Sequence, residues 1–388
     1  MPVVNRAAGM ADEIAQWRRD FHTHPELRYE ERRTARKVAE MLQAAGCDEV
    51  VSGIGRTGVV GVIRGRRSDS GRVIGLRADM DALPIEEATD LPYRSRNPGV
   101  MHACGHDGHT AMLLGAAKYL AETRNFDGTA VVIFQPAEEG GAGAKAMIED
   151  GLLDRWNIQE VYGMHNSPGL PVGAFAIRPG PLMAAADRIR IEVEGRGGHA
   201  AWPHDCADTI LAASAIVLAA QNIVSRNVDP LKSAVVSITM IAAGHTDNVI
   251  PQTATLLGTT RTLEPAVRDL VEHRLHEIVA GTAAAYGVKA TLNYRRDYPT
   301  VVNHADNTAF AARVAAEIAG ADKVDTDVAP RMGAEDFAFM LNERPGAFIF
   351  AGNGDTAPLH NPSYDFNDEL IPVGVSYWAR LVEARMPA

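Results

Sequence analysis

Cysteine is scarce in this chain of 388 residues, which holds three of them with no paired spacing. An odd and sparse set of thiols argues against a disulfide-bonded scaffold and favours a reducing compartment. The N-terminus lacks the apolar segment of a secretion signal, and the longest apolar run, residues 210–220, is shorter than the roughly 20 residues of a membrane span. We therefore expect a cytoplasmic protein without a membrane partner.

Positive charge is also in short supply, because 38 Lys and Arg face 49 Asp and Glu for a formal net charge of −11. This balance argues against nucleic acid as a partner, although one local arginine can still bind an anionic substrate. The chain contains no P-loop, no Gly-x-Ser-x-Gly elbow and no His-Glu-x-x-His motif, which disfavours kinases, α/β serine hydrolases and thermolysin-like proteases. Residues 53–58 spell a dinucleotide fingerprint, but a strand pattern follows where a helix is required.

The pattern of apolar runs predicts an α/β protein of about two domains. Four runs are typical of buried strands and alternate with helical patterns: residues 59–63, 73–77, 129–134 and 160–163. From residue 186 the order changes to strand, helix, two strands, helix and strand, which is the ferredoxin-like pattern. We predict a mostly parallel catalytic domain of residues 1–185 and 298–388, with residues 186–297 inserted as a ferredoxin-like α+β domain.

The densest group of reactive side chains lies in residues 101–109, which carry one thiol, three imidazoles and one carboxylate. An apolar helix is predicted directly after it, over residues 110–117. Taken singly, Cys104 could be a buried thiol and His106 a hydrogen-bonded core histidine. Their Cys-x-His spacing beside two glycines favours metal ligation instead. His102 and His109 flank the pair, and a structural role is the better interpretation for each.

Further acids and imidazoles follow the neighbouring predicted strands. Asp79 and Asp81 end one strand, Glu138 and Glu139 follow the next, and His165 ends a third. Carboxyl ends of parallel strands meet at one edge of the sheet, where α/β proteins bind ligands. Adjacent glutamates are often a plain surface pair, but after a buried strand one can bind metal while the other moves a proton. Imidazole, thiolate and carboxylate together suit zinc or a similar divalent ion.

These motifs resemble the amidohydrolases of the hippurate hydrolase, N-acyl-L-amino acid amidohydrolase and auxin-conjugate hydrolase group, a branch of the zinc aminoacylase–carboxypeptidase superfamily. The resemblance runs nearly end to end through residues 21–27, 77–84, 101–109, 135–140, 195–199, 248–251 and 332–337. It implies a catalytic domain with an inserted dimerisation or lid domain, assembled as a homodimer or homotetramer.

The resemblance also implies a site for two divalent metal ions (Zn, Mn, Ni or Co). Its ligands would be Cys104, His106, Glu139, His165 and His360, with Cys104 as the bridging ligand. Glu138 would be the catalytic acid and base. Asp81 sits where relatives hold an aspartate that orients a metal-bound histidine. Asp79 stands where those relatives carry that histidine, so the separate duties of the two aspartates stay open.

Three residues of the insertion acquire roles by the same resemblance. His199 would stabilise the oxyanion from across a dimer, and Asn248 and Arg261 would hold the carboxylate of the substrate. From chemistry alone, His199 is a loop histidine and Arg261 could equally form a surface ion pair.

The predicted reaction is hydrolysis of an N-acyl-L-amino acid to a carboxylic acid and a free amino acid. A water activated by the two metals would attack the acyl carbonyl, with Glu138 as general acid and base. The alternative is a metal-dependent dipeptidase or carboxypeptidase that uses the same site. A non-catalytic metal-binding relative is a third hypothesis, and the presence of Glu138 counts against it. The acyl group and the amino-acid side chain stay open.

Overall fold

The computed structural model describes residues 2–388 and divides the chain into two compact units. Unit 1 comprises Met1–Gly180, Val302–Ala329 and Asp336–Ala388, and unit 2 comprises Pro181–Val301 and Pro330–Glu335. The predicted insertion, residues 186–297, falls inside unit 2. Each unit contains a sheet of its own and a separate hydrophobic core.

Unit 1 is built on an eight-stranded sheet in the order β1-β2-β4-β3-β5-β16-β6-β15. The central pairs β4–β3, β3–β5 and β5–β16 are parallel, whereas β1–β2, β2–β4 and β16–β6 are antiparallel. The strands are β1 (Glu49–Ile54), β2 (Gly58–Arg64), β3 (Val73–Asp79), β4 (Thr129–Gln135), β5 (Glu160–Pro168), β6 (Phe175–Ala176), β15 (Val324–Asp325) and β16 (Gly346–Gly354). The structure thus confirms the predicted mostly parallel α/β class.

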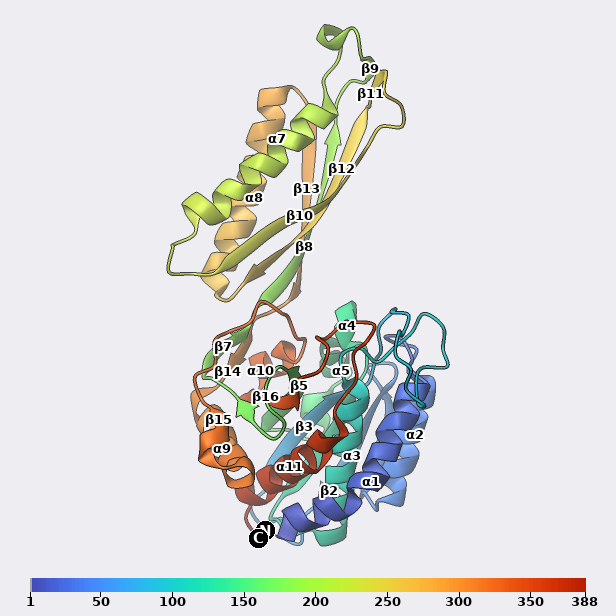
Figure 1. The fold of residues 1–388 in the computed structure, drawn as a ribbon. Coiled ribbons are helices and arrows are strands. Elements are labelled where there is room, and N and C mark those ends of the chain that lie inside the picture. The colour runs from blue at the N-terminus through green and yellow to red at the C-terminus, as the bar shows by residue number, and fades with distance from the viewer. Residues whose placement is uncertain (1) are drawn as a thin grey trace. The chain divides into compact units, whose positions relative to one another are not determined.

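Helix α3 (His106–Thr123) is the central helix of unit 1 and packs against α1 (Pro2–Thr23) and α11 (Ile371–Arg385) (Figure 1). Fifteen of its 18 residues are buried, which explains its almost uniformly apolar sequence after the first turn. Close packing requires Gly115, because a Cβ there would lie 2.5 Å from Ile14 Cδ1. The remaining helices of unit 1 are α2 (Arg32–Ala44), α4 (Glu138–Gly141), α5 (Gly143–Glu149), α6 (Leu152–Arg155), α9 (Ala305–Ala319) and α10 (Ala338–Glu343).

Unit 2 contains a four-stranded antiparallel sheet in the order β10-β12-β8-β13. Alternate residues of β8, such as Ile189 and Ile191, are buried in clusters that include Ile216 of α7 and Leu275 of α8. The elements are β8 (Ala185–Glu194), α7 (Thr209–Asn222), β10 (Ala234–Ala243), β12 (Thr253–Thr262), α8 (Pro265–Tyr286) and β13 (Lys289–Tyr298). This order confirms the predicted ferredoxin-like pattern. Short strands complete the chain: β7 (Gly180–Met183), β9 (Gly198–His199), β11 (Val249–Ile250) and β14 (Val301–Asn303).

The helical stretch Thr209–Asn227 has 19 residues and is long and apolar enough, by length and composition, to cross a membrane. The expectation of no membrane span rested on the shorter apolar run of residues 210–220. Asp208 caps its N-terminus by accepting hydrogen bonds from the N–H groups of Ile210 and Leu211. One side of this helix packs on the sheet of unit 2, while Leu218 on another side is 75% exposed.

Candidate metal centre

The predicted ligands of unit 1 come from neighbouring strand ends and two loops. Strands β4 and β5 flank β3 on either side, so their carboxyl ends lie at one edge of the sheet. Glu139 follows β4, and His165 lies within β5. The loop before α3 supplies Cys104, and His106 is the first residue of that helix. His360 comes from the loop between β16 and α11.

The structure brings all five predicted metal ligands together. The potential ligand atoms of Cys104, His106 and His165 lie within 4.8 Å of one another, and so do those of Cys104, Glu139 and His360. Cys104 Sγ is 3.4 Å from His165 Nε2, and His360 Nε2 is 3.1 Å from Glu139 Oε1. Cys104 therefore belongs to both groups, which is the position that a bridging thiolate requires.

The histidine hydrogen bonds fit a metal site. His106 Nδ1 donates to the carbonyl of Asp81 at 2.8 Å, and His165 Nδ1 donates to the carbonyl of Asn166 at 2.7 Å. Each bond fixes the tautomer that leaves a lone pair on Nε2. Within residues 2–388, the buried Nε2 of His106 has no hydrogen-bond partner. The nitrogen, sulfur and oxygen donors suit zinc or a related borderline ion.

The electrostatics of this cluster favour a cation. Burial raises the pKa of the Cys104 thiol to about 12, and the negative charge of Glu139 adds to that rise. A thiolate in this position therefore needs a positive charge beside it. Burial and the charge of His109 hold the pKa of His165 well below its ordinary value, which keeps its imidazole neutral, the form that binds metal. Glu139 has a lowered pKa, because His360 and His106 outweigh its burial.

Asp81 holds the turn that carries the two glutamates. Its Oδ1 accepts a hydrogen bond from the N–H of Glu138 at 3.0 Å, and its Oδ2 accepts one from the N–H of Glu139 at 2.9 Å. Asp81 Oδ1 also lies 3.3 Å from Nδ1 of His106, whose main partner is the Asp81 carbonyl. Asp81 thus contacts both the metal-site histidine and the backbone of the adjacent acids. Glu138 itself is buried, with 7% of its surface exposed.

Asp79 contacts a different set of groups. One carboxylate oxygen accepts from Arg77 at 2.7 Å, and the other accepts from Nδ1 of His109 at 2.6 Å. His109 in turn packs against the ring of His165, with 4.5 Å between the ring centroids. Asp79 therefore binds His109, and His109 packs against the predicted ligand His165. Both oxygens of Asp79 have partners, and Asp79 also forms a group with His106 and His109 whose potential ligand atoms lie within 4.8 Å of one another.

Comparison with known proteins identifies the family. The sequence profile of peptidase family M20/M25/M40 matches residues 75–384. The chain belongs to this family. It is 45% identical to hippurate hydrolase of Campylobacter jejuni over 98% of each chain, and 41% identical to N-acetylcysteine deacetylase of Bacillus subtilis over 95% of each. The crystal structure of Bacillus subtilis YxeP, described as a dinuclear metal-binding peptidase of family M20, superposes with a TM-score of 0.85, 36% identity and 98% and 99% coverage of the two chains. The protein is thus a metal-dependent hydrolase of the M20 family.

A buried charge network lies behind the ligands of this M20 chain. The guanidinium of Arg18, which is fully buried, lies 3.5 Å from Asp107 and 3.0 Å from Asp365. His22 Nδ1 lies 2.9 Å from Asp107, and its Nε2 lies 3.3 Å from Glu87. The network therefore joins α1 to the first turn of α3 and to the loop after His360. Sequence reasoning missed Arg18, because a lone arginine in an N-terminal helix carries no local signal.

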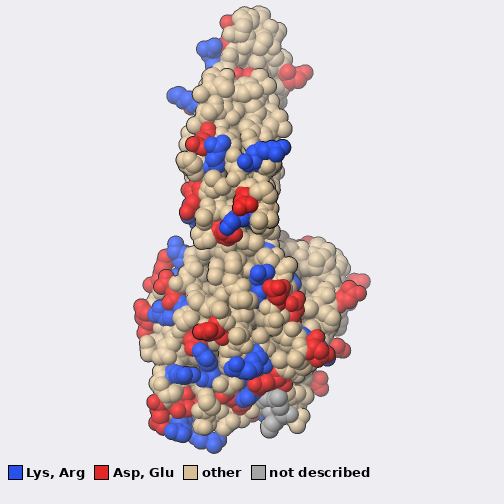
Figure 2. Space-filling model, turned by 90° about the vertical axis from the view of Figure 1, so that its left-hand side faces the viewer, with Lys and Arg blue, Asp and Glu red and all other residues tan. Residues whose placement is uncertain are grey.

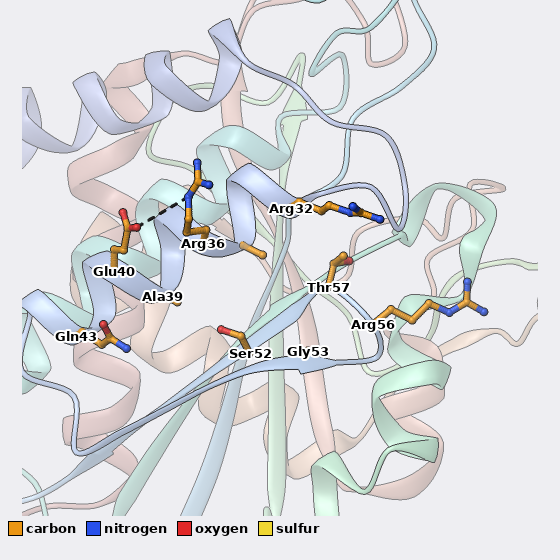
Figure 3. Close-up of a pocket in the computed structure, with 10 residues that line it drawn as sticks. Arg32, Arg36, Ala39, Glu40, Gln43, Ser52, Gly53, Arg56 and Thr57 are labelled. Atoms are coloured by element: carbon orange, nitrogen blue, oxygen red, sulfur yellow. Dashed lines mark ion pairs between the residues drawn. The ribbon is translucent and has the colours of Figure 1, made fainter.

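Two grooves of unit 1 were not foreseen. One of about 350 Å³ is bounded by Glu139 and by the apolar side chains of Leu27, Leu83 and Pro84. The other, of about 530 Å³, lies between α2 and the β1–β2 hairpin, where Arg36 turns toward Glu40 (Figure 3). The second groove contains none of the predicted metal ligands. The first one reaches the metal centre through Glu139.

The remaining predicted residues lie in unit 2. His199 pairs with Val249 across β9 and β11, and the N–H of Ala200 donates to the Asn248 carbonyl at 3.0 Å, so His199 and Asn248 are neighbours. Arg261 lies near the far end of β12, eight residues beyond Thr253. At a rise of about 3.4 Å per residue, these two ends of β12 are about 27 Å apart. Asn248 and Arg261 of one copy therefore do not lie together.

Proposed function

We propose that this protein hydrolyses the amide bond of N-acyl amino acids to give a carboxylic acid and a free amino acid. The observation that carries the proposal is the cluster of five ligands, three of them buried, with the buried Glu138 directly beside it. Similarity over the whole chain to a hippurate hydrolase and an N-acetylcysteine deacetylase supports this substrate class. On the face seen in Figure 2, acidic and basic side chains of unit 1 are interspersed.

The residues of the cluster divide the chemistry between them. Cys104, His106, Glu139, His165 and His360 would hold two divalent ions, which supply Lewis acidity and an activated water when bound. Glu138 takes the proton of the attacking water and then returns it to the departing amine. Asp81 keeps Glu138 in place by accepting a hydrogen bond from the backbone N–H of Glu138. His199 of a second copy would donate to the oxyanion, an interaction of about 3 kcal/mol for one such donor.

We propose further that the working enzyme is a homodimer formed through unit 2. Strand β10 is an edge of its sheet and exposes Met240 and Ile241, by 44% and 53%. Leu218 of α7 adds an apolar side chain that is 75% exposed. Unpaired strand edges with apolar side chains pair readily with a second copy. Since Asn248 and Arg261 of one copy lie far apart, both can hold one substrate carboxylate only if they come from different copies.

The groove beside Glu139 is the proposed place for an apolar part of the substrate. Leu27, Leu83 and Pro84 provide apolar walls, and its volume of about 350 Å³ is in the range of small-ligand pockets. A bulky substituent that fills it would bury apolar surface worth about 25 cal/mol per Å². A panel of N-acyl amino acids that varies the acyl group and the amino acid separately would show which part of the substrate fills this groove.

One experiment tests the proposed reaction. Protein stripped with a chelator should be inactive and should regain activity with Zn²⁺, Mn²⁺, Co²⁺ or Ni²⁺. The reconstituted enzyme should cleave hippurate or N-acetyl amino acids faster than dipeptides. Full activity after complete metal removal would refute the metal centre, and a preference for dipeptides would favour a peptidase instead.

The role of Glu138 needs a variant that keeps the metals. Glu138→Gln should bind them normally but lose at least about 100-fold in kcat, the usual size of general acid–base catalysis. Glu149→Gln is the matched control, because Glu149 lies on the surface of α5 and its side chain is 66% exposed. Normal turnover by Glu138→Gln would refute the assignment.

A further inference from the structure

The turn that carries Glu138 has an unusual backbone. Ala137 has φ +53° and Ala142 has φ +56°, both in the left-handed region that favours glycine. Between them, Gly140 has φ +76°. Residues other than glycine adopt this conformation only where the surroundings enforce it, and such strain is concentrated at functional sites. Specific contacts must therefore hold this turn.

Carboxylates hold three consecutive backbone N–H groups of the turn. The N–H of Ala137 donates to Oε1 of Glu31 at 2.9 Å, and the next two N–H groups donate to Asp81. The second oxygen of Glu31 accepts from the hydroxyl of Thr57 at 2.6 Å. Asp81 was expected at the site from the sequence, whereas Glu31 was not. Glu31 lies more than 100 residues before the turn and is fully buried.

Glu31 does not serve its own helix. It occupies the N-cap position of α2, but within residues 2–388 its side chain makes no capping hydrogen bond. Glu26 performs that role instead, because its two oxygens accept from the N–H groups of Arg33 and Thr34 at 3.0 and 2.8 Å. The carboxylate of Glu31 is thereby directed to Ala137 and Thr57.

Burial at this position destabilises the charged form of the Glu31 carboxylate. Burial raises the pKa of Glu31 to about 7; the Thr57 hydroxyl partly opposes this rise, and the negative charge of Asp81 adds to it. An acid kept in such surroundings without a cationic hydrogen-bond partner points to a functional role more than to a structural one. The contacts of Glu31 identify the turn as the object of that role.

We propose that Glu31 is a positioning residue: by holding the N–H of Ala137 it fixes the left-handed turn, and so aims the carboxylate of Glu138 at the metal-site water. This inference rests on the proposed function, in which Glu138 is the general base. A displacement of about 1 Å at a reacting group can lower a rate by about 100-fold. Loss of Glu31 should therefore act on kcat and leave KM nearly unchanged.

The first measurement compares steady-state kinetics of Glu31→Ala, Glu31→Gln and wild type on one N-acyl amino acid. We expect Glu31→Ala to lose about 10- to 100-fold in kcat, with KM within about threefold. Glu31→Gln should recover most of the activity, because its amide oxygen can still accept from Ala137. Metal content, measured on the same samples, should stay at the wild-type level in both variants.

The decisive measurement is a double-mutant cycle with Glu138→Gln. If Glu31 acts through Glu138, Glu31→Ala should change the residual kcat of the Glu138→Gln enzyme by less than about threefold. An equal loss in both backgrounds would overturn the inference, and so would an unchanged kcat in Glu31→Ala alone. Failure of the proposed function looks different, since Glu138→Gln would then be active by itself.

A matched control separates positioning from stability. Glu26→Ala removes the cap of the same helix and should lower the melting temperature, but its kcat should stay within twofold of wild type. If Glu31→Ala does not fold, Glu31→Asp replaces it in the cycle, because its shorter carboxylate cannot reach the N–H of Ala137. A Glu26→Ala enzyme as slow as Glu31→Ala would show that helix stability, and not positioning, explains the loss.

Discussion

Gly105, between the ligands Cys104 and His106, offers a sharp test of how the metal centre is held. Its φ is +89°, and a Cβ built there would lie 2.5 Å from Asn166 Oδ1 and 2.7 Å from the Tyr364 hydroxyl. Both neighbours are buried and hydrogen-bonded to each other at 2.6 Å, so neither can easily give way. Gly105→Ala should therefore displace the loop that presents the two ligands.

The magnitude follows from a matched glycine. Gly46, after α2, has nearly the same φ of +85°, but nothing lies within 4 Å of a Cβ built there. Gly46→Ala should cost only the left-handed conformation, about 1–2 kcal/mol of unfolding free energy. Gly105→Ala should cost the same plus overpacking of about 1–3 kcal/mol. Its total is therefore about 2–5 kcal/mol.

Two assays separate these outcomes. Urea denaturation of metal-loaded protein should rank wild type, Gly46→Ala and Gly105→Ala in that order. Competition with a chelator should show metal affinity unchanged in Gly46→Ala and reduced about 10- to 100-fold in Gly105→Ala, the usual effect of disturbing the support of a metal ligand. If both variants had equal stability and equal affinity, the steric reasoning about this loop would be wrong.

Two further predictions concern the charge network and the assembly. Burial opposes the charge of His22, but the hydrogen bonds that His22 donates to Asp107 and Glu87 raise its pKa from 6.5 to about 9, so the charged form stabilises the fold by about 3 kcal/mol. This contribution is fully present below pH 6.5 and is lost as the pH rises through 9. The difference in unfolding free energy between wild type and His22→Gln should therefore narrow in denaturation measurements at pH 6, 8 and 10. A constant difference would contradict this prediction. Leu218→Asp on α7 should shift the mass measured by light scattering from dimer to monomer, while Tyr286→Asp at the end of α8 should not; a dimeric Leu218→Asp would exclude this face as the interface.

The sequence was sufficient for the fold class because each predicted element had a local pattern. The buried run of β4 and the alternating residues of β8 both behave as their periods predict. Boundaries were less accurate. Helix α3 begins at His106 and not at residue 110. The first turn of α3 is polar because it serves the metal centre. The apolar pattern in the sequence therefore begins about one turn after the helix itself begins.

Cys104, His106, Glu139 and His165 stood out in the sequence because each adjoins a recognisable element, whereas His360 lies in a loop and was suggested only by the family resemblance. The residues that support the ligands could not be predicted, because Arg18 and Glu31 act across more than 100 positions and resemble ordinary surface charges in the sequence. Strand β1 was missed for a related reason: it is an edge strand, and its residues show no clean apolar alternation. Long-range polar contacts leave no periodic signal, whereas burial of an element does.

The distribution of these supports explains why the metal centre belongs to unit 1 as a whole. Cys104 and His106 are held by a loop that a single methyl group would distort, and Glu138 sits on a turn that two acids from other segments restrain. His360 follows the same logic, since Arg18 binds Asp365 a few residues beyond it. The segments that carry Cys104 and His106, Glu138, and His360 thus each depend on contacts with residues far away in sequence. Metal affinity should therefore depend on the folding of the entire unit, so that α1, which contributes no ligand, is as necessary for the metal centre as the strands that do.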